Sequence, residues 1–151
     1  METHDFKKFP ELTNTQMQEW YFLSPHKQIN EDFVARVIKV HDGDTITLNW
    51  AERDFNFPIR FINIAAPELN EIGGKEAQSW LESQILKQEV EIKINNANRV
   101  DKWGRLLGNV LFNGLDLGET EIHLGLALPW SQVSEQNPIP NINQILEKAW
   151  S

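Results

Sequence analysis

The HDGDT string at His41–Thr45 constrains the fold of this chain more than any other feature. It lies between two runs, 33–40 and 46–48, whose β-branched and apolar residues are typical of strands. A glycine between two aspartates predicts a tight turn, in which Gly43 takes the positive φ that such turns need. The two carboxylates therefore fall at the tip of a hairpin. A plain turn that carries aspartates by chance is the simplest interpretation of this string alone.

Two charged segments follow further along the chain. The apolar run 57–64 contains Arg60, and Glu68 comes shortly after that run. Because an unpaired charge inside an apolar strand is costly, Arg60 is expected to have an anionic partner. The RVDKWGR segment at 99–105 is a charged, glycine-containing turn between two apolar runs. Phosphodiester hydrolysis needs such parts: a hard cation held by oxygens, a base for water, and cationic groups on the phosphate.

With these three motifs the chain resembles the staphylococcal-nuclease-like (thermonuclease) family. The motifs occur in the family's order, as DGDT at 42–45, APE at 66–68 and RVDKWGR at 99–105. The string at 113–118, leading into a helix over 121–127, also looks like that family's turn and second helix. The resemblance implies an α+β fold, a five-stranded OB-fold β-barrel with packed helices.

The chain divides into three expected regions. Residues 1–32 form an N-terminal extension with a short helix, 33–130 form the nuclease-like OB-fold core, and 131–151 form a C-terminal connection and a short helix. Strands are expected near 33–40, 45–50, 57–64, 90–96 and 105–112. An amphipathic helix over 74–88, between the third and fourth strands, matches the OB-fold order.

The two terminal regions each predict a helix. Thr15 followed by Gln18 resembles a capping box, and the helix it starts should stop by Ser24-Pro25. The aromatic residues at 20–22 are expected to pack on the core or on a partner rather than to stack on bases. At the other end, a helix over 142–150 is expected to bury Ile145, Leu146 and Trp150.

Composition is consistent with one globular domain. The chain has 151 residues, 40% of them hydrophobic, and no cysteine, so it has neither disulfides nor thiolate ligands. No apolar run approaches the ~18–20 residues of a membrane helix, and the N-terminus lacks the pattern of a signal peptide. We therefore expect no membrane association, with the cytoplasm as the default compartment. The net charge of −8 predicts weak, salt-sensitive binding to nucleic acid, with arginines focused in one cleft.

The resemblance implies a role for each matching residue. Arg60 would contact the scissile phosphate, Glu68 would act as general base on the attacking water, and Arg105 would clamp the phosphate and aid the leaving group. Lys102 would touch a flanking phosphate, and Trp103 would stack on a base. An ordinary surface aromatic is an equally good interpretation of Trp103.

The same resemblance implies a Ca²⁺ site. Asp44 would be a direct ligand and Asp42 would lie near the ion, with the backbone carbonyl of Ala66 as a further donor. The chain departs from the family at Ala65, where the family has a second carboxylate ligand. Calcium takes 6–8 oxygens, so the site is expected to be weak. Asn63, on the same face of the expected strand, is a further candidate donor, one full pleat away from Ala65.

Two classes of function remain open from the sequence. The first is a calcium-dependent endonuclease that cleaves single- or double-stranded DNA or RNA, weakened by Ala65. The second is a catalytically inactive OB-type module that binds nucleic acid or a protein, with residues 1–32 as the candidate surface for a protein partner. A purely structural ion pair between Arg60 and Glu68 is a third interpretation of those two charges.

Overall fold

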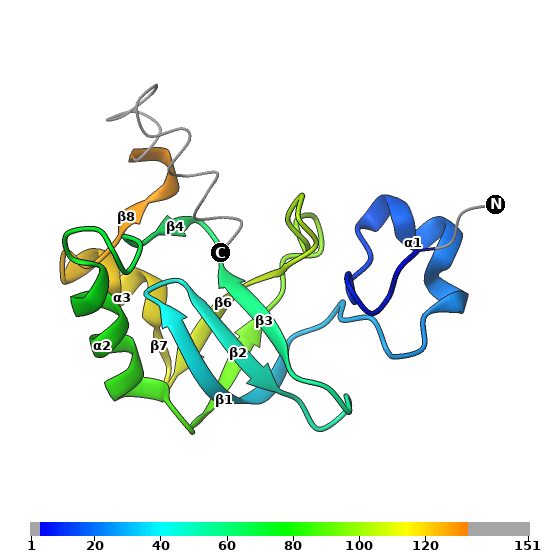
Figure 1. The fold of residues 1–151 in the computed structure, drawn as a ribbon, viewed down its shortest axis with the longest axis horizontal. Coiled ribbons are helices and arrows are strands. Elements are labelled where there is room, and N and C mark those ends of the chain that lie inside the picture. Colours follow the sequence, from blue (N-terminus) through cyan, green and yellow to red (C-terminus); the bar gives the residue numbers. More distant parts are fainter. Residues whose placement is uncertain (1–3, 133–151) are drawn as a thin grey trace.

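A five-stranded barrel forms the centre of the molecule in the computed structural model, which describes residues 4–132 (Figure 1). Its strands are β1 (Phe33–Asp42), β2 (Thr45–Asn49), β3 (Phe57–Phe61), β5 (Glu89–Lys93) and β6 (Leu106–Phe112). They pair antiparallel in the order β3-β2-β1-β5-β6, and a parallel pairing of β3 with β6 closes the barrel. The predicted α+β fold with an OB-type barrel is confirmed.

Short elements complete the barrel and cover it. β7 (Leu115–Asp116) pairs antiparallel with the end of β6. β4 (Ile64–Ala65) pairs with β8 (Leu128–Pro129) in a separate two-stranded sheet. The helices α2 (Gly74–Ile85) and α3 (Leu117–His123) lie on the same side of the barrel (Figure 1). None of the helices in the described part of the chain is long and apolar enough to cross a membrane.

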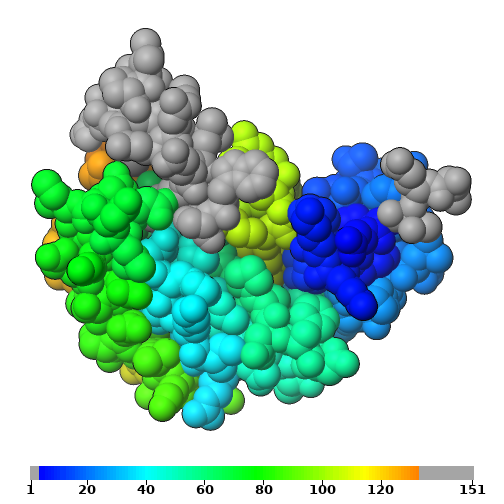
Figure 2. Space-filling view, in the orientation of Figure 1, coloured from blue at the N-terminus to red at the C-terminus, as the bar shows by residue number. Residues whose placement is uncertain are grey.

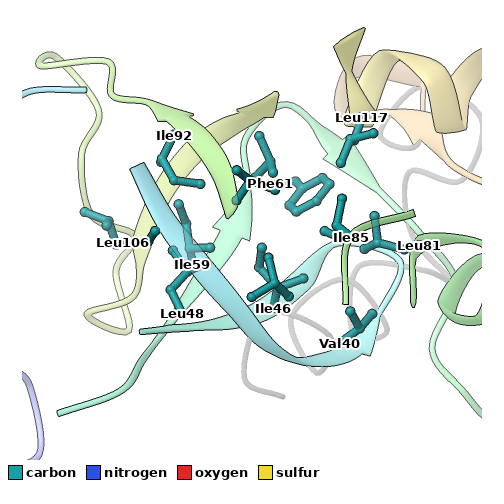
Figure 3. Close-up of a cluster of buried hydrophobic side chains, with 14 of the residues drawn as sticks. Val40, Ile46, Leu48, Ile59, Phe61, Leu81, Ile85, Ile92, Leu106 and Leu117 are labelled. Atoms are coloured by element: carbon teal, nitrogen blue, oxygen red, sulfur yellow. The ribbon is translucent and has the colours of Figure 1, made fainter. Parts of the chain in front are cut away.

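The hydrophobic core fills the barrel and continues under α2. β1 alternates buried and exposed residues over its first half, as expected for a strand with one face inward. α2 turns Ala77, Leu81 and Ile85 toward β1 and buries them completely, which confirms its predicted apolar stripe. Figure 3 shows the centre of this cluster, with Val40, Ile46, Leu48, Ile59, Phe61, Leu81, Ile85, Ile92, Leu106 and Leu117. Each such side chain contributes about 1.5–3 kcal/mol by its burial.

The strand expected over 57–64 is interrupted. β3 ends at Phe61, Asn63 adopts a left-handed conformation with φ of 67°, and only then does β4 begin. Asparagine tolerates this conformation better than most residues. Asn63 and Ala65 therefore do not share one face of a continuous strand, and the carbonyl of Asn63 accepts a hydrogen bond from the Trp130 amide at 2.9 Å.

The helix expected over 121–127 begins and ends earlier than predicted, because its caps lie elsewhere. The side chain of Asp116 accepts a hydrogen bond from the Glu119 amide at 3.1 Å, which starts α3 at Leu117. Gly125 has a φ of 75°, as is typical of the residue after a helix end.

The N-terminal helix α1 (Asn14–Trp20) exists, but its predicted cap was wrong. Thr13 and Gln16 form the capping box, and a 3₁₀ turn, η1 (Tyr21–Leu23), follows before the chain leaves the helix at Ser24. The aromatic side chains that follow α1 do not all pack on the core, since Phe22 is 95% exposed.

Residues 4–30, here called the N-terminal lobe, lie at the end of the barrel opposite α2 and α3 (Figure 1). Arg53 links the barrel to this lobe through two hydrogen bonds to Glu11, at 2.6 and 2.8 Å, and both side chains are buried. Arg99, in the β5–β6 loop, donates to the carbonyls of Ile29 at 2.7 Å and Leu12 at 3.0 Å. Burial lowers the pKa of Arg99, and the nearby Glu11 partly opposes that shift. The lobe is therefore anchored by two buried arginines.

The C-terminal region lies outside the described residues beyond residue 132. The connection with its two prolines and the helix predicted over 142–150 therefore stay predictions, as does the burial of Ile145, Leu146 and Trp150.

Candidate active site

The DGDT turn connects β1 to β2, as predicted. Oδ1 of Asp42 accepts a hydrogen bond from the Asp44 amide at 3.0 Å, so the first carboxylate shapes the turn itself. Asp44 is completely buried, and its Oδ1 accepts from the Thr45 hydroxyl at 3.1 Å. Both aspartates therefore point into the protein.

Gly43 does not take the positive φ that the sequence suggested. A glycine is needed there because the turn is tightly enclosed. A Cβ on Gly43 would lie 2.7 Å from the Cβ of Ala66, 2.7 Å from Oε1 of Glu121 and 2.9 Å from the Cβ of Ala77. The turn is thus packed against α2, α3 and the residue that follows β4 at once.

Replacing Gly43 by alanine is expected to lower the free energy of unfolding by about 1–3 kcal/mol, the usual cost of overpacking a core. Urea denaturation of Gly43→Ala measures this. Gly114→Ala is the control for loss of a glycine alone, because nothing lies within 4 Å of a Cβ there, although its φ of 79° adds strain. A Gly43→Ala protein as stable as the unaltered chain would contradict the close packing of the turn.

Arg60 has the anionic partner that its position in an apolar strand demands, and that partner is Asp44. The β2–β3 register places Thr45 opposite Arg60. Nη2 of Arg60 lies 3.4 Å from Oδ2 of Asp44, and the Ala66 amide donates to the same oxygen at 2.9 Å. Nη1 of Arg60 donates to the Phe61 carbonyl at 2.9 Å. The strand arginine, the turn aspartate and the backbone before Glu68 therefore form one connected cluster.

Arg105 is held by the carboxylate of Asp101. Nε of Arg105 lies 2.9 Å from Oδ2 of Asp101, while Oδ1 accepts from the backbone amides of Arg105 at 2.8 Å and Trp103 at 3.0 Å. Both terminal nitrogens of Arg105 are buried and have no hydrogen-bond partner among the described residues. Asp101 thus orients the guanidinium through its Nε side, while the two terminal nitrogens have no acceptor among the described residues.

The two arginines line one cavity of about 180 Å³, here called the arginine cavity. The parallel β3–β6 register pairs Ile59 with Leu106, so Arg60 and Arg105 lie near the same point of the barrel seam. The guanidinium of Arg60 lies 5.4 Å from the centre of the Trp130 ring. The described lining consists of Arg60, Ile62, Asn63, Asn98, Asp101, Trp103, Arg105, Leu107 and Trp130.

Trp103 belongs to the described lining of this cavity, whereas Glu68 and Lys102 do not. Glu68 is half-buried and follows β4, and its backbone amide donates to the Glu71 carboxylate at 2.7 Å. Lys102 is exposed, with its Nζ 4.6 Å from the centre of the Trp103 ring. The structure therefore brings Arg60 and Arg105 together at one cavity, which Trp103 of the β5–β6 loop also lines.

The acidic residues offer few ligands to a calcium ion. No group of three or more His, Asp or Glu side chains in the described part of the chain is placed to hold a metal. Asp44 already accepts hydrogen bonds from Thr45 and Ala66, and Ala65 has no donor atom in its side chain. Two carboxylates and a backbone carbonyl fit at most a weak site, in which water supplies most of the ligands.

His41 stands next to the acidic turn. Its Nε2 lies 2.6 Å from the hydroxyl of Thr47. Burial lowers the pKa of His41, and the charge of Lys39 lowers it further. The lowered pKa favours the neutral imidazole beside Asp42.

Sequence reasoning missed two residues that shape the site. Asp101 lies inside the RVDKWGR motif, and its four-residue spacing to Arg105 is a signal that could have identified the pair. Trp130 had no such signal, because the chain folds back through β8 to bring it against Arg60.

The barrel is closed, two arginines line one cavity, and Asp44 of the acidic hairpin contacts one of them. The model of the staphylococcal nuclease homologue family matches residues 58–150, more than half of the chain. The chain belongs to this family of nuclease-like proteins, as its motifs predicted.

Proposed function

We propose that this protein is a phosphodiesterase, an endonuclease that cleaves DNA or RNA. The observation that carries the proposal is the pair of buried terminal nitrogens on Arg105, which have no partner among the described residues. Buried donors without an acceptor are costly, and a phosphate would satisfy them with charge-assisted hydrogen bonds. Arg60 lines the same cavity and adds a second positive charge.

In the proposed reaction, water attacks phosphorus in line with the leaving oxygen. Glu68 accepts a proton from the water as the new P–O bond forms, and the P–O bond to the leaving oxygen breaks. That oxygen then takes a proton from solvent. Arg60 and Arg105 neutralise the charge that develops on the phosphoryl oxygens. The position of Glu68, two residues after the Ala66 amide that binds Asp44, supports this role.

Calcium dependence is the finer part of the proposal. Asp44 would hold Ca²⁺, with Asp42 and the carbonyl of Ala66 beside it. When bound, the ion supplies positive charge next to the phosphate. Because Ala65 removes one carboxylate from the family's ligand set, we propose a weak site that needs millimolar calcium.

The first experiment is cleavage of single-stranded DNA with millimolar calcium or with EDTA. We expect slow, calcium-dependent cleavage by the unaltered chain, faster cleavage at lower calcium by Ala65→Asp, and none by Glu68→Gln. Full activity of Glu68→Gln would contradict the assigned base. If neither the unaltered chain nor Ala65→Asp cleaves, the alternative function, a binding module without catalysis, replaces the nuclease.

The proposed partners follow from this chemistry. Single- or double-stranded DNA or RNA would bind through its backbone, and the net charge of −8 predicts that added salt weakens the binding strongly. A protein partner on residues 1–32 stays a prediction, for which the exposure of Tyr21, Phe22 and Leu23 is the supporting observation.

A further inference from the structure

A second and larger hollow lies between the N-terminal lobe and the barrel. It measures about 610 Å³, and we call it the lobe groove. Trp103 and Arg105 line both the lobe groove and the arginine cavity, so the two are neighbours that share a wall. Figure 2 shows the lobe (blue) directly beside the segment around residue 100 (yellow-green), with strands of the barrel (cyan and teal) below them.

The walls of the lobe groove carry positive charge and aromatic rings. Lys7 and Lys8 come from the lobe, and Arg105 from the β5–β6 loop. Glu11 is neutralised by its buried pair with Arg53 and Arg105 is paired with Asp101, which leaves Lys7 and Lys8 against Asp54. This local excess of positive charge stands out in a chain with a net charge of −8. It is the pattern that attracts a polyanion.

The lining of the lobe groove includes the aromatic rings of Phe6, Phe55, Phe57 and Trp103, of which Phe57 is buried, and the imidazole of His26. Base-on-aromatic stacking is how proteins hold unpaired nucleotides without reading their sequence, at about 1–3 kcal/mol per base. Bases in a duplex have no free face for such stacking. A groove volume near 600 Å³ is within the usual range for sites that enclose small organic groups.

The two walls of the lobe groove are fixed to each other. A Cβ on Gly104 would lie 3.0 Å from a ring carbon of Phe9, so the β5–β6 loop packs directly on the lobe. Arg99 ties the same loop to the carbonyls of Leu12 and Ile29. The groove is thus formed before any ligand arrives, which reduces the entropic cost of binding.

We infer that the lobe groove binds the nucleotides that flank the scissile phosphate, and that the occupant is single-stranded nucleic acid. The inference rests on the proposed function, since it extends the substrate from the arginine cavity along Trp103 into the groove. Lys7 and Lys8 contact flanking phosphates, and the aromatic walls contact unpaired bases. The N-terminal lobe is therefore a substrate-binding part of this protein and favours single strands over duplexes.

The test measures binding separately from cleavage. Fluorescence anisotropy with a labelled single-stranded oligothymidylate, in EDTA, is compared for the unaltered chain and the double variant Lys7→Glu, Lys8→Glu. Both lysines are exposed, so the double variant is expected to fold. The control, Lys75→Glu with Lys87→Glu, makes the same change of net charge at exposed lysines at the two ends of α2.

The groove variant is expected to bind about tenfold more weakly than the control at 50 mM salt, because each phosphate contact contributes to the salt-dependent affinity. The slope of log affinity against log salt should fall by about one per lysine. A duplex of the same sequence should bind more weakly than the single strand. Its affinities for the groove variant and for the control should differ by less than those of the single strand.

Equal losses in the groove variant and the control would overturn the inference, because they would reflect net charge alone. A duplex that binds as tightly as the single strand would also overturn it. These results are independent of the proposed function. If the protein cleaves DNA but the groove variant binds as well as the control, only the inference about the lobe groove is contradicted. If the groove variant loses binding but the protein does not cleave, only the proposed nuclease activity is contradicted.

Discussion

Replacing Arg105 by alanine is expected to lower kcat/KM for cleavage of single-stranded DNA by about 10²–10³-fold, the usual cost of removing one preorganised charge donor. The reason is the geometry of its guanidinium. Asp101 holds Nε at 2.9 Å, and the two terminal nitrogens, buried at the arginine cavity, have no partner among the described residues. In the proposed reaction, their interaction with the phosphate would become stronger as charge develops in the transition state.

Two further variants make this result specific. Arg105→Lys keeps the charge but loses the planar guanidinium with its two terminal donors. Its activity should therefore fall between those of Arg105→Ala and the unaltered chain. Arg36→Ala removes an exposed arginine on β1 and should leave activity unchanged. Thermal denaturation, monitored by circular dichroism, checks that each variant is folded. If Arg105→Ala cleaves as fast as Arg36→Ala, Arg105 does not touch the phosphate.

Replacing Arg53 by methionine is expected to lower the free energy of unfolding by about 3–5 kcal/mol, because it leaves a buried carboxylate without its partner. The Glu11 side chain is only 3% exposed, and it receives both terminal nitrogens of Arg53. The guanidinium also lies 4.5 Å from the centre of the Phe57 ring. The loss should appear in urea denaturation as a lower midpoint.

Lys27→Met is the matched control for this change. The Lys27–Glu52 pair is also in direct contact, at 3.3 Å, but both side chains are about half exposed, so its loss should cost about 0–1 kcal/mol. Removing both buried charges together, with Glu11→Leu and Arg53→Met, should restore part of the stability. An Arg53→Met protein as stable as Lys27→Met would show that the lobe is not anchored by this pair.

The barrel could be predicted from the sequence because its signals are local. The alternation in β1, the glycine turn at Gly43 and the apolar stripe of α2 each lie within about ten residues. The break at Asn63 escaped prediction because an asparagine in an apolar run can continue a strand or turn left-handed, and the hydrogen bond from Trp130 is made by a distant segment.

The candidate site was predictable only in its parts. Arg60, Glu68 and Arg105 could be named from their motifs, and an anionic partner for Arg60 followed from the cost of burial. Its identity as Asp44 depended on strand register, and the role of Asp101 on the shape of one loop. The pair of Glu11 and Arg53 joins residues 42 positions apart, which no local pattern predicts.

The anchoring of the N-terminal lobe also has a consequence for the order of folding. Arg99 binds a carbonyl of residue 29, 70 positions earlier, and one of residue 12, 87 positions earlier. During synthesis on the ribosome the lobe therefore emerges long before the side chain that fastens it. Leu12 is completely buried in the finished molecule, and we expect it to become fully protected only after the β5–β6 loop has been made. Barrel closure between β3 and β6 and docking of the lobe then become nearly simultaneous late events.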